Sequence, residues 1–226
     1  MNSKPKNFIY YCKVVIIVII LFSISQSLLY SQDTIRKAFV SFHTGGYIPS
    51  RGDFDKIYGT PVAFINGLSL GIPFTNRDIY FYVKAMYYYK SGIPIVYHYT
   101  YNNGVSSTTT TQEGKIVINN WLFNGGIQEN FSVGNNYKIH LNAGLSFVKS
   151  SEVVKTPPES KIALSGWAGY YIGIGGEKRF ANLPFGVFVE YQYNLDRLIF
   201  KSLGLNYGGS DINTGLRFYF SQTIQN

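Results

Sequence analysis

The sequence predicts an all-β protein: an eight-stranded antiparallel up-and-down transmembrane β-barrel that follows an N-terminal signal peptide. Three observations lead to this prediction. Eight segments alternate apolar and polar residues with the two-residue period of a strand. The connections between them are alternately short and long, which is typical of outer-membrane barrels. Charged residues make up only 14% of the 226 residues, whereas soluble domains have roughly 25%.

The first 31 residues are predicted to be a signal peptide for export. Lys4, Lys6 and Lys13 precede an apolar run at residues 14–24, which is the order of a secretory signal. The run is short for a membrane-spanning helix, which needs about 20 apolar residues. Cleavage after Ser31 would leave one barrel domain, residues 32–226, and would remove Cys12, the single cysteine. The mature chain would then have no disulfide or thiol chemistry.

The first four predicted strands lie at residues 39–47, 64–72, 79–90 and 119–128. The third shows the alternation clearly, with Phe81 and Val83 on one face and Tyr82 and Lys84 on the other. The connection after the second strand, TNRD at 75–78, is short and rich in turn residues. The stretch after the third strand, 91–114, is long and polar, and we expect it to be a mobile loop outside the cell.

The last four predicted strands lie at residues 137–147, 165–176, 185–194 and 211–220, with short connections SVGNN and ANLP at 132–136 and 181–184. In the strand at 137–147, the aliphatic Ile139, Leu141 and Leu145 lie between Tyr137 and Phe147. Aromatic rings at both ends of an aliphatic band match the interfacial girdles of a membrane barrel, so this face is predicted to contact lipid. Interior faces then contain small residues that make room for larger ones: Gly126, Gly144, Gly169, Gly173, Gly175 and Gly215.

Two segments near the ends of the predicted domain resemble a known family. FHTGGYIPSRGDFDKIYG at 42–59 and GSDINTGLRFYF at 209–220 are similar to the outer membrane protein beta-barrel domain family, the small OmpA/OmpX-like barrels. The resemblance implies an eight-stranded barrel in the outer membrane of a Gram-negative-type cell, inserted by the barrel-insertion machinery. The chain departs from the family at its end, where SQTIQN follows the aromatic Phe220.

Six charged residues fall on the polar, interior faces of the predicted strands. Charges in so narrow a bore must pair, because an isolated buried ion is very costly. We predict a structural network of salt bridges that closes the barrel, with a gate or an ion path as the alternative. Its members are Lys84, Lys138, Glu177, Arg179, Glu190 and Arg217.

No catalytic, metal or cofactor site is predicted. His43, His98 and His140 lack ligand-like spacing, and we expect His140 to be a hydrogen-bonded interior residue. The segment GIGGEKRF at 173–180 lacks the glycine spacing of a phosphate-binding loop. We interpret RGD at 51–53 as part of a turn in the first long connection and not as an adhesion motif.

The observations favour a non-enzymatic protein with a structural or surface-interaction role through long extracellular loops. Tyr97, Tyr99 and Tyr101 are candidate contact residues, since tyrosine supplies amphipathic contact area. The alternatives are a small channel or transport barrel, a lipid-modifying outer-membrane enzyme and a soluble exported ligand-binding barrel. Outer-membrane lipid, lipopolysaccharide and an unidentified extracellular ligand are the expected partners of a monomer. Nucleic acid is not expected, because the net charge of +8 is scattered along the chain.

Overall fold

The computed structural model describes residues 37–50, 54–74, 78–102, 105–155, 160–180, 183–195 and 208–221. The predicted signal peptide and the RGD segment lie outside these ranges. No helix within these ranges is long and apolar enough to span a membrane.

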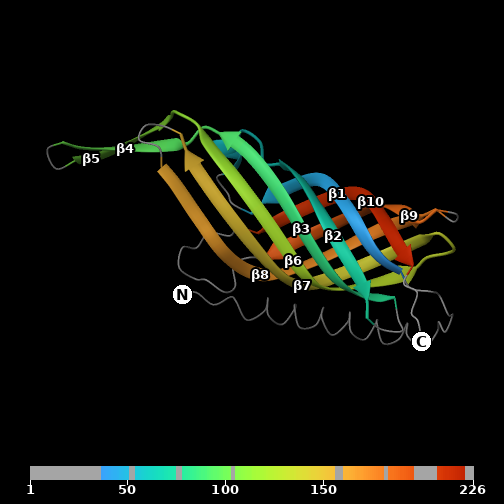
Figure 1. The fold of residues 1–226 in the computed structure, drawn as a ribbon. Coiled ribbons are helices and arrows are strands. Elements are labelled where there is room, and N and C mark those ends of the chain that lie inside the picture. Colours follow the sequence, from blue (N-terminus) through green and yellow to red (C-terminus); the bar gives the residue numbers. More distant parts are fainter. Residues whose placement is uncertain are drawn as a thin grey trace, which may run out of the picture. The chain divides into compact units, whose positions relative to one another are not determined.

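Eight strands close into one antiparallel barrel (Figure 1). Each strand pairs with the barrel strands before and after it in the chain, and β1 pairs with β10 to complete the closure. All eight lie where the alternation of apolar and polar residues predicts them, so the predicted fold class is confirmed. They are β1 (Lys37–Pro49), β2 (Ala63–Pro73), β3 (Ile79–Gly92), β6 (Ile116–Ser132), β7 (Tyr137–Val154), β8 (Ser160–Arg179), β9 (Phe185–Leu195) and β10 (Gly209–Ser221).

The segment at 91–114 is not the irregular loop that the sequence predicts. It contains β4 (Ile95–Asn102) and β5 (Val105–Gln112), which pair with each other in a separate two-stranded sheet. Both runs are rich in aromatic or β-branched residues, which favour strands. They flank Asn103-Gly104, a dipeptide that favours tight hairpin turns. The hairpin projects away from the barrel, from the end that has the long connections (Figure 1).

Three neighbouring strands extend furthest beyond their predicted ends. β6, β7 and β8 contain 17, 18 and 20 residues, whereas β1 and β10 contain 13 each. The polar connection expected between β7 and β8 continues the sheet instead, with pairing as far as Val154 and Ser160. A register shift between Val148 and Lys149 accommodates this extension, as β-bulges do.

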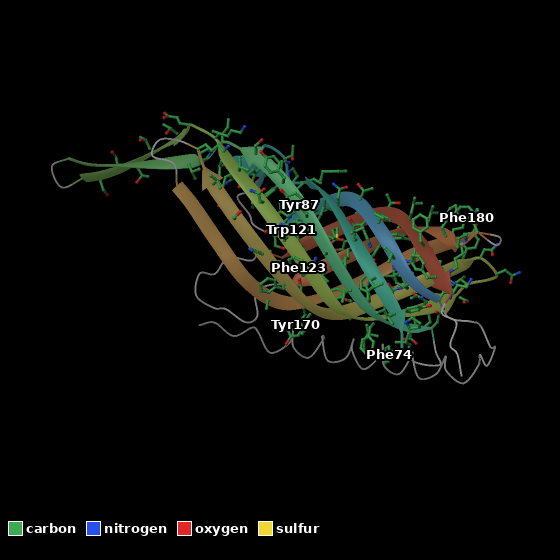
Figure 2. All side chains as sticks on the ribbon, in the orientation of Figure 1. Phe74, Tyr87, Trp121, Phe123, Tyr170 and Phe180 are labelled. Carbon is green, nitrogen blue, oxygen red and sulfur yellow. The ribbon has the colours of Figure 1, made fainter. Side chains whose placement is uncertain are left out.

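In the middle of the barrel, polar side chains point inward and apolar side chains point outward. On β7, His140, Asn142 and Ser146 are buried, whereas Leu145 and Phe147 are exposed. The inward and outward faces predicted for 137–147 are therefore confirmed. Figure 2 shows outward aromatic rings toward both ends of the barrel: Phe74 and Phe180 toward the short turns, and Tyr87, Trp121 and Tyr170 toward the long connections.

Glycine on the inner face makes room for the polar interior, as expected. A Cβ atom at Gly173 would collide with the side chain of Asn142, and one at Gly175 would collide with the ring of His140. Both glycines lie on β8, beside the β7 residues that they accommodate. They allow two large polar side chains of β7 to enter a bore that eight strands leave narrow.

Candidate functional site

The middle of the barrel contains a buried ion cluster built from three strands. Lys84 Nζ on β3 lies 2.7 Å from Glu190 Oε1 on β9 and 3.4 Å from Asp211 Oδ1 on β10, and all three side chains are fully buried. Lys84 also donates a hydrogen bond of 3.1 Å to Gln192 Oε1. One ammonium therefore joins two carboxylates that are more than 100 residues away in the chain.

The second oxygen of Glu190 has two partners of its own. Asn142 Nδ2 donates to Glu190 Oε2 over 2.8 Å, and His140 Nε2 lies 3.2 Å from the same oxygen. Both residues belong to β7. Glu190 thus links β3 to β7 across the bore, and His140 is a hydrogen-bonded interior residue.

Nearer the short turns, Arg217 fills the bore between two aromatic rings. Its guanidinium carbon lies 4.1 Å from the ring centroid of Phe39 and 5.0 Å from that of Phe188. Arg217 donates to Glu177 Oε2 over 2.8 Å and to Ser41 Oγ over 3.0 Å. Glu177 compensates the buried charge of Arg217, and Nη1 and Nε have hydrogen-bond acceptors in Glu177 and Ser41.

Glu177 connects Arg217 to residues at the short-turn end of the barrel. Arg179 Nε donates to Glu177 Oε1 over 3.2 Å, and the hydroxyl of Tyr219 donates to the same oxygen. The guanidinium of Arg179 also stacks over the Tyr219 ring, 3.9 Å from its centroid. Aromatic and charged groups together occupy this end of the interior, where Phe39, Tyr80, Tyr82 and Tyr219 are buried.

Asp78, in the short turn between β2 and β3, forms an ion pair with Lys138 of β7 and accepts a hydrogen bond of 2.7 Å from the Tyr80 hydroxyl. Burial by itself would raise the pKa of the Asp78 carboxyl, but the Lys138 ammonium and the two hydrogen bonds hold it below its usual value. Asp78 thereby links the start of β3 to β7.

The six charged residues selected from the sequence all point inward, in three groups. Lys84 lies with Glu190, and Glu177 lies with Arg179 and Arg217, whereas Lys138 pairs with Asp78. Sequence reasoning missed Asp78 and Asp211. Asp211 shares the polar face of its strand with Arg217, so the alternation could have identified it. Asp78 lies in a turn, where no periodicity indicates direction.

The other end of the interior is apolar and is covered by the short helix α2 (Phe54–Tyr58). Its Phe54, Ile57 and Tyr58 belong to a buried cluster that includes Tyr47, Tyr88 and residues of β6. The backbone N–H of Ile93 donates to the carbonyl of Ile57 over 2.8 Å, and the Tyr58 hydroxyl donates to Glu152 Oε1 over 3.1 Å. α2 therefore packs into the long-connection end of the barrel and covers it.

One histidine–serine pair deserves comparison with a catalytic dyad. His43 Nε2 lies 2.8 Å from Ser69 Oγ, but both side chains are buried inside the barrel. No carboxylate bonds His43 Nδ1 in the described part of the chain, so the third residue of a Ser-His-Asp triad has no counterpart there. Within the same residues, no group of three or more His, Cys, Asp or Glu side chains is arranged to hold a metal ion.

The candidate contact residues Tyr97, Tyr99 and Tyr101 lie on β4, opposite Thr110, Thr108 and Ser106 of β5. Only their backbone is described, and their side chains lie outside the described part of the structure. On β5, the residues from Ser106 to Thr109 are exposed.

Comparison with solved structures supports the fold. The chain is similar to Neisserial surface protein A (NspA), with a TM-score of 0.56 and 15% identity over 81% of this chain and 97% of that one. It is also similar to Ail, the attachment invasion locus protein of Yersinia pestis (TM-score 0.45, 10% identity, 82% of this chain and 99% of that one). The N-terminal β-barrel domain of Pseudomonas aeruginosa OprF has a TM-score of 0.38 and 16% identity over 82% of this chain and 98% of that one. No protein-family model and no curated protein matches the chain.

The chain therefore has the fold of a small eight-stranded outer-membrane barrel. Its outward surface is suited to lipid, because the exposed side chains include Leu68, Val83, Leu145, Ile174 and Val189. A soluble protein would not expose an apolar belt around its whole circumference. The fold and this belt together locate the barrel in an outer membrane.

Proposed function

We propose that this protein is a non-enzymatic outer-membrane barrel that contacts external partners through the hairpin β4–β5. The barrel anchors the hairpin, and its filled interior serves stability. This proposal is supported by the contrast between a closed, covered bore and a hairpin that extends beyond the barrel from the same end as the covering helix (Figure 1).

The proposal rests on the outer edges of the hairpin. Within the described residues, β4 and β5 pair only with each other, so no third strand is paired along the outer edge of either. Natural proteins protect such edges with charged residues or proline. The segment Ile95–Gln112 contains no Lys, Arg, Asp, Glu or Pro. An uncharged, unprotected edge is a template on which a partner can add a strand, with main-chain hydrogen bonds supplying affinity.

An isolated two-stranded hairpin is only marginally stable in water. A partner strand that joins either edge would convert it into a three-stranded sheet. We therefore expect binding to be accompanied by protection of the β4 and β5 amides from hydrogen exchange, with little change in the barrel strands.

The test compares bacteria that display three versions of the protein. One is unchanged, one has residues 95–112 replaced by a short Gly-Ser linker, and one carries Ser107→Lys and Thr109→Lys in β5. Adhesion to immobilised extracellular-matrix proteins and to cells with the same protein is measured. We expect both altered versions to lose adhesion while keeping the heat-modifiable gel migration of a folded barrel. Equal adhesion of all three versions would contradict the proposal.

A further inference from the structure

The outward wall of the barrel is not uniform near the short turns. A groove with a volume of about 530 Å³ crosses β7, β8 and β9 there. Its outward lining includes Tyr137, Ile139, Gly176, Lys178, Val187 and Val189. The groove lies in the surface that faces lipid, so its occupant must be a molecule that resides in the membrane.

Gly176 is the reason for the groove. On β8 it follows the outward residues Ile172 and Ile174, and it pairs with Ile139 on β7 and with Val189 on β9. A Cβ atom at Gly176 would meet no other atom within 4 Å. The missing side chain therefore leaves a depression between two ridges of aliphatic residues.

One cation lies at the end of the groove nearest the short turn. Lys178 is two residues beyond Gly176, and its ammonium lies 5.6 Å from the ring centroid of Tyr137. The other charged residues of the lining, Lys138 and Glu177, are bound inside the barrel to Asp78 and Arg217. The groove is thus apolar along its length, with a lysine and a tyrosine where the strands end.

We propose that this groove is a binding site for an anionic phospholipid of the leaflet at the short-turn end. One acyl chain lies over Gly176 between Ile139 and Val189, and the phosphate lies against Lys178. Lysine and tyrosine at the end of an apolar surface are typical of headgroup depth, and a lysine attracts anionic lipid. The site requires the barrel to span a membrane but does not depend on the hairpin.

The experiment uses photo-cross-linking in phosphatidylethanolamine vesicles. The folded protein is reconstituted with a trace of phosphatidylglycerol that has a diazirine midway along one acyl chain, and labelled peptides are identified by mass spectrometry. We expect labelling of Ile139, Val187 and Val189 to exceed that of Leu68 and Val83 on the opposite wall. A phosphatidylcholine analogue should label the groove roughly fivefold less, the difference expected for one lysine near an anionic lipid.

Two variants and two matched controls separate the parts of the site. Gly176→Leu should reduce groove labelling to the level of the opposite wall, whereas Gly125→Leu, outward on β6, should not. Lys178→Gln should abolish the preference for phosphatidylglycerol and keep the acyl label, whereas Lys149→Gln should change neither. Heat-modifiable migration verifies folding of each variant.

Uniform labelling around the belt would overturn the proposal, as would groove labelling that survives Gly176→Leu. Groove labelling weaker than that of the opposite wall would show that the groove is covered by something other than lipid, such as a second copy, and would also overturn the proposal. Replacement of residues 95–112 by the linker should leave the labelling unchanged, so failure of this site and failure of the proposed function are distinguishable.

Discussion

Glu190 is a fully buried carboxylate in the middle of the barrel. It has no exposed surface, and its two oxygens are bound by Lys84, Asn142 and His140 from two other strands. Removal of one partner from a buried pair is costly mainly because it leaves the remaining charge without compensation. The stability of the barrel therefore depends strongly on this single side chain.

We expect Glu190→Ala to lower the free energy of unfolding by about 3 kcal/mol, since it leaves Lys84 with only Asp211 as a counterion. The measurement is urea unfolding in lipid vesicles, followed by tryptophan fluorescence. Glu113→Ala is the matched control, because Glu113 is exposed in the connection before β6. Equal unfolding midpoints for the two variants would show that the buried cluster does not stabilise the barrel.

The ion pair of Asp78 predicts a dependence of stability on pH. Its carboxyl has a pKa below the usual value in the folded protein, so its contribution is present above the unfolded pKa of about 3.9 and is lost as the pH falls through the folded pKa. In Asp78→Asn this part of the acid destabilisation should be absent. Unfolding midpoints of both proteins, measured from neutral pH to below pH 4, should converge at the acid end. A constant difference across the range would exclude the linkage.

At the scale of single elements, the outward face of a strand has aliphatic residues at the depth of the membrane core and aromatic residues toward the interfaces. On β3, Val83 and Ala85 lie between Phe81 and Tyr87, with Tyr89 nearer the long connection. Trp121 on β6 lies beside Tyr87, with ring centroids 4.8 Å apart, and continues the girdle to the next strand (Figure 2). The loss of stability caused by an outward-facing charged residue should therefore depend on the position of that residue along the strand.

Val83→Arg should destabilise the inserted barrel by roughly 2–4 kcal/mol, because it places a cation near the middle of the bilayer. Tyr89→Arg, on the same face, should cost only about 0–1 kcal/mol, because its side chain is near the interface. The two side chains are similarly exposed, at 52% and 53%, so exposure alone would predict equal effects. Refolding yield and urea unfolding in vesicles provide the comparison.

The hairpin provides a test of topology. Chymotrypsin added to intact cells should cut in the tyrosine-rich segment at 95–112, whereas the short turn at 75–78 should be cut by an added protease only after the outer membrane is opened. The expectation follows from the position of the hairpin at the end with long connections, which in outer-membrane barrels is the external end. Cleavage only after the membrane is breached would place the hairpin on the inner side.

At the scale of the whole molecule, three kinds of packing occupy the bore in succession. Apolar residues of α2, β1, β3 and β6 fill the end with long connections, the cluster around Lys84 crosses the middle, and Arg217 with its aromatic neighbours fills the end with short turns. An eight-stranded barrel leaves an interior that side chains can fill. This arrangement supports a structural role for the interior.

We therefore expect the refolded protein to show no frequent, long-lived openings of porin-like conductance in planar bilayers. Replacement of residues 54–58 by Gly-Ser tests the contribution of α2, and we expect no stable pore in that variant either, because the Lys84 and Arg217 clusters remain. Sustained conductance in the unmodified protein would support the channel alternative.

The sequence by itself determined the eight strands, their inward and outward faces and the six interior charges. This was possible because a strand places successive side chains on opposite faces, so the composition of each face is readable without a partner. The same reasoning misjudged the hairpin: its low charge and Ser/Thr content resembled a loop, although Asn103-Gly104 and the flanking β-branched residues favour paired strands.

Only the tertiary structure decided which charges meet. Lys84 and Glu190 are 106 residues apart in the chain, and their contact depends on how the barrel closes and on the stagger between its strands. The same holds for α2, which covers the bore only because its connection folds back into it, and for the groove at Gly176, which needs β7 and β9 on either side. The alternation along one strand predicts whether each side chain points inward or outward. The partner that an inward side chain meets across the bore depends on how the barrel closes and on the stagger between its strands.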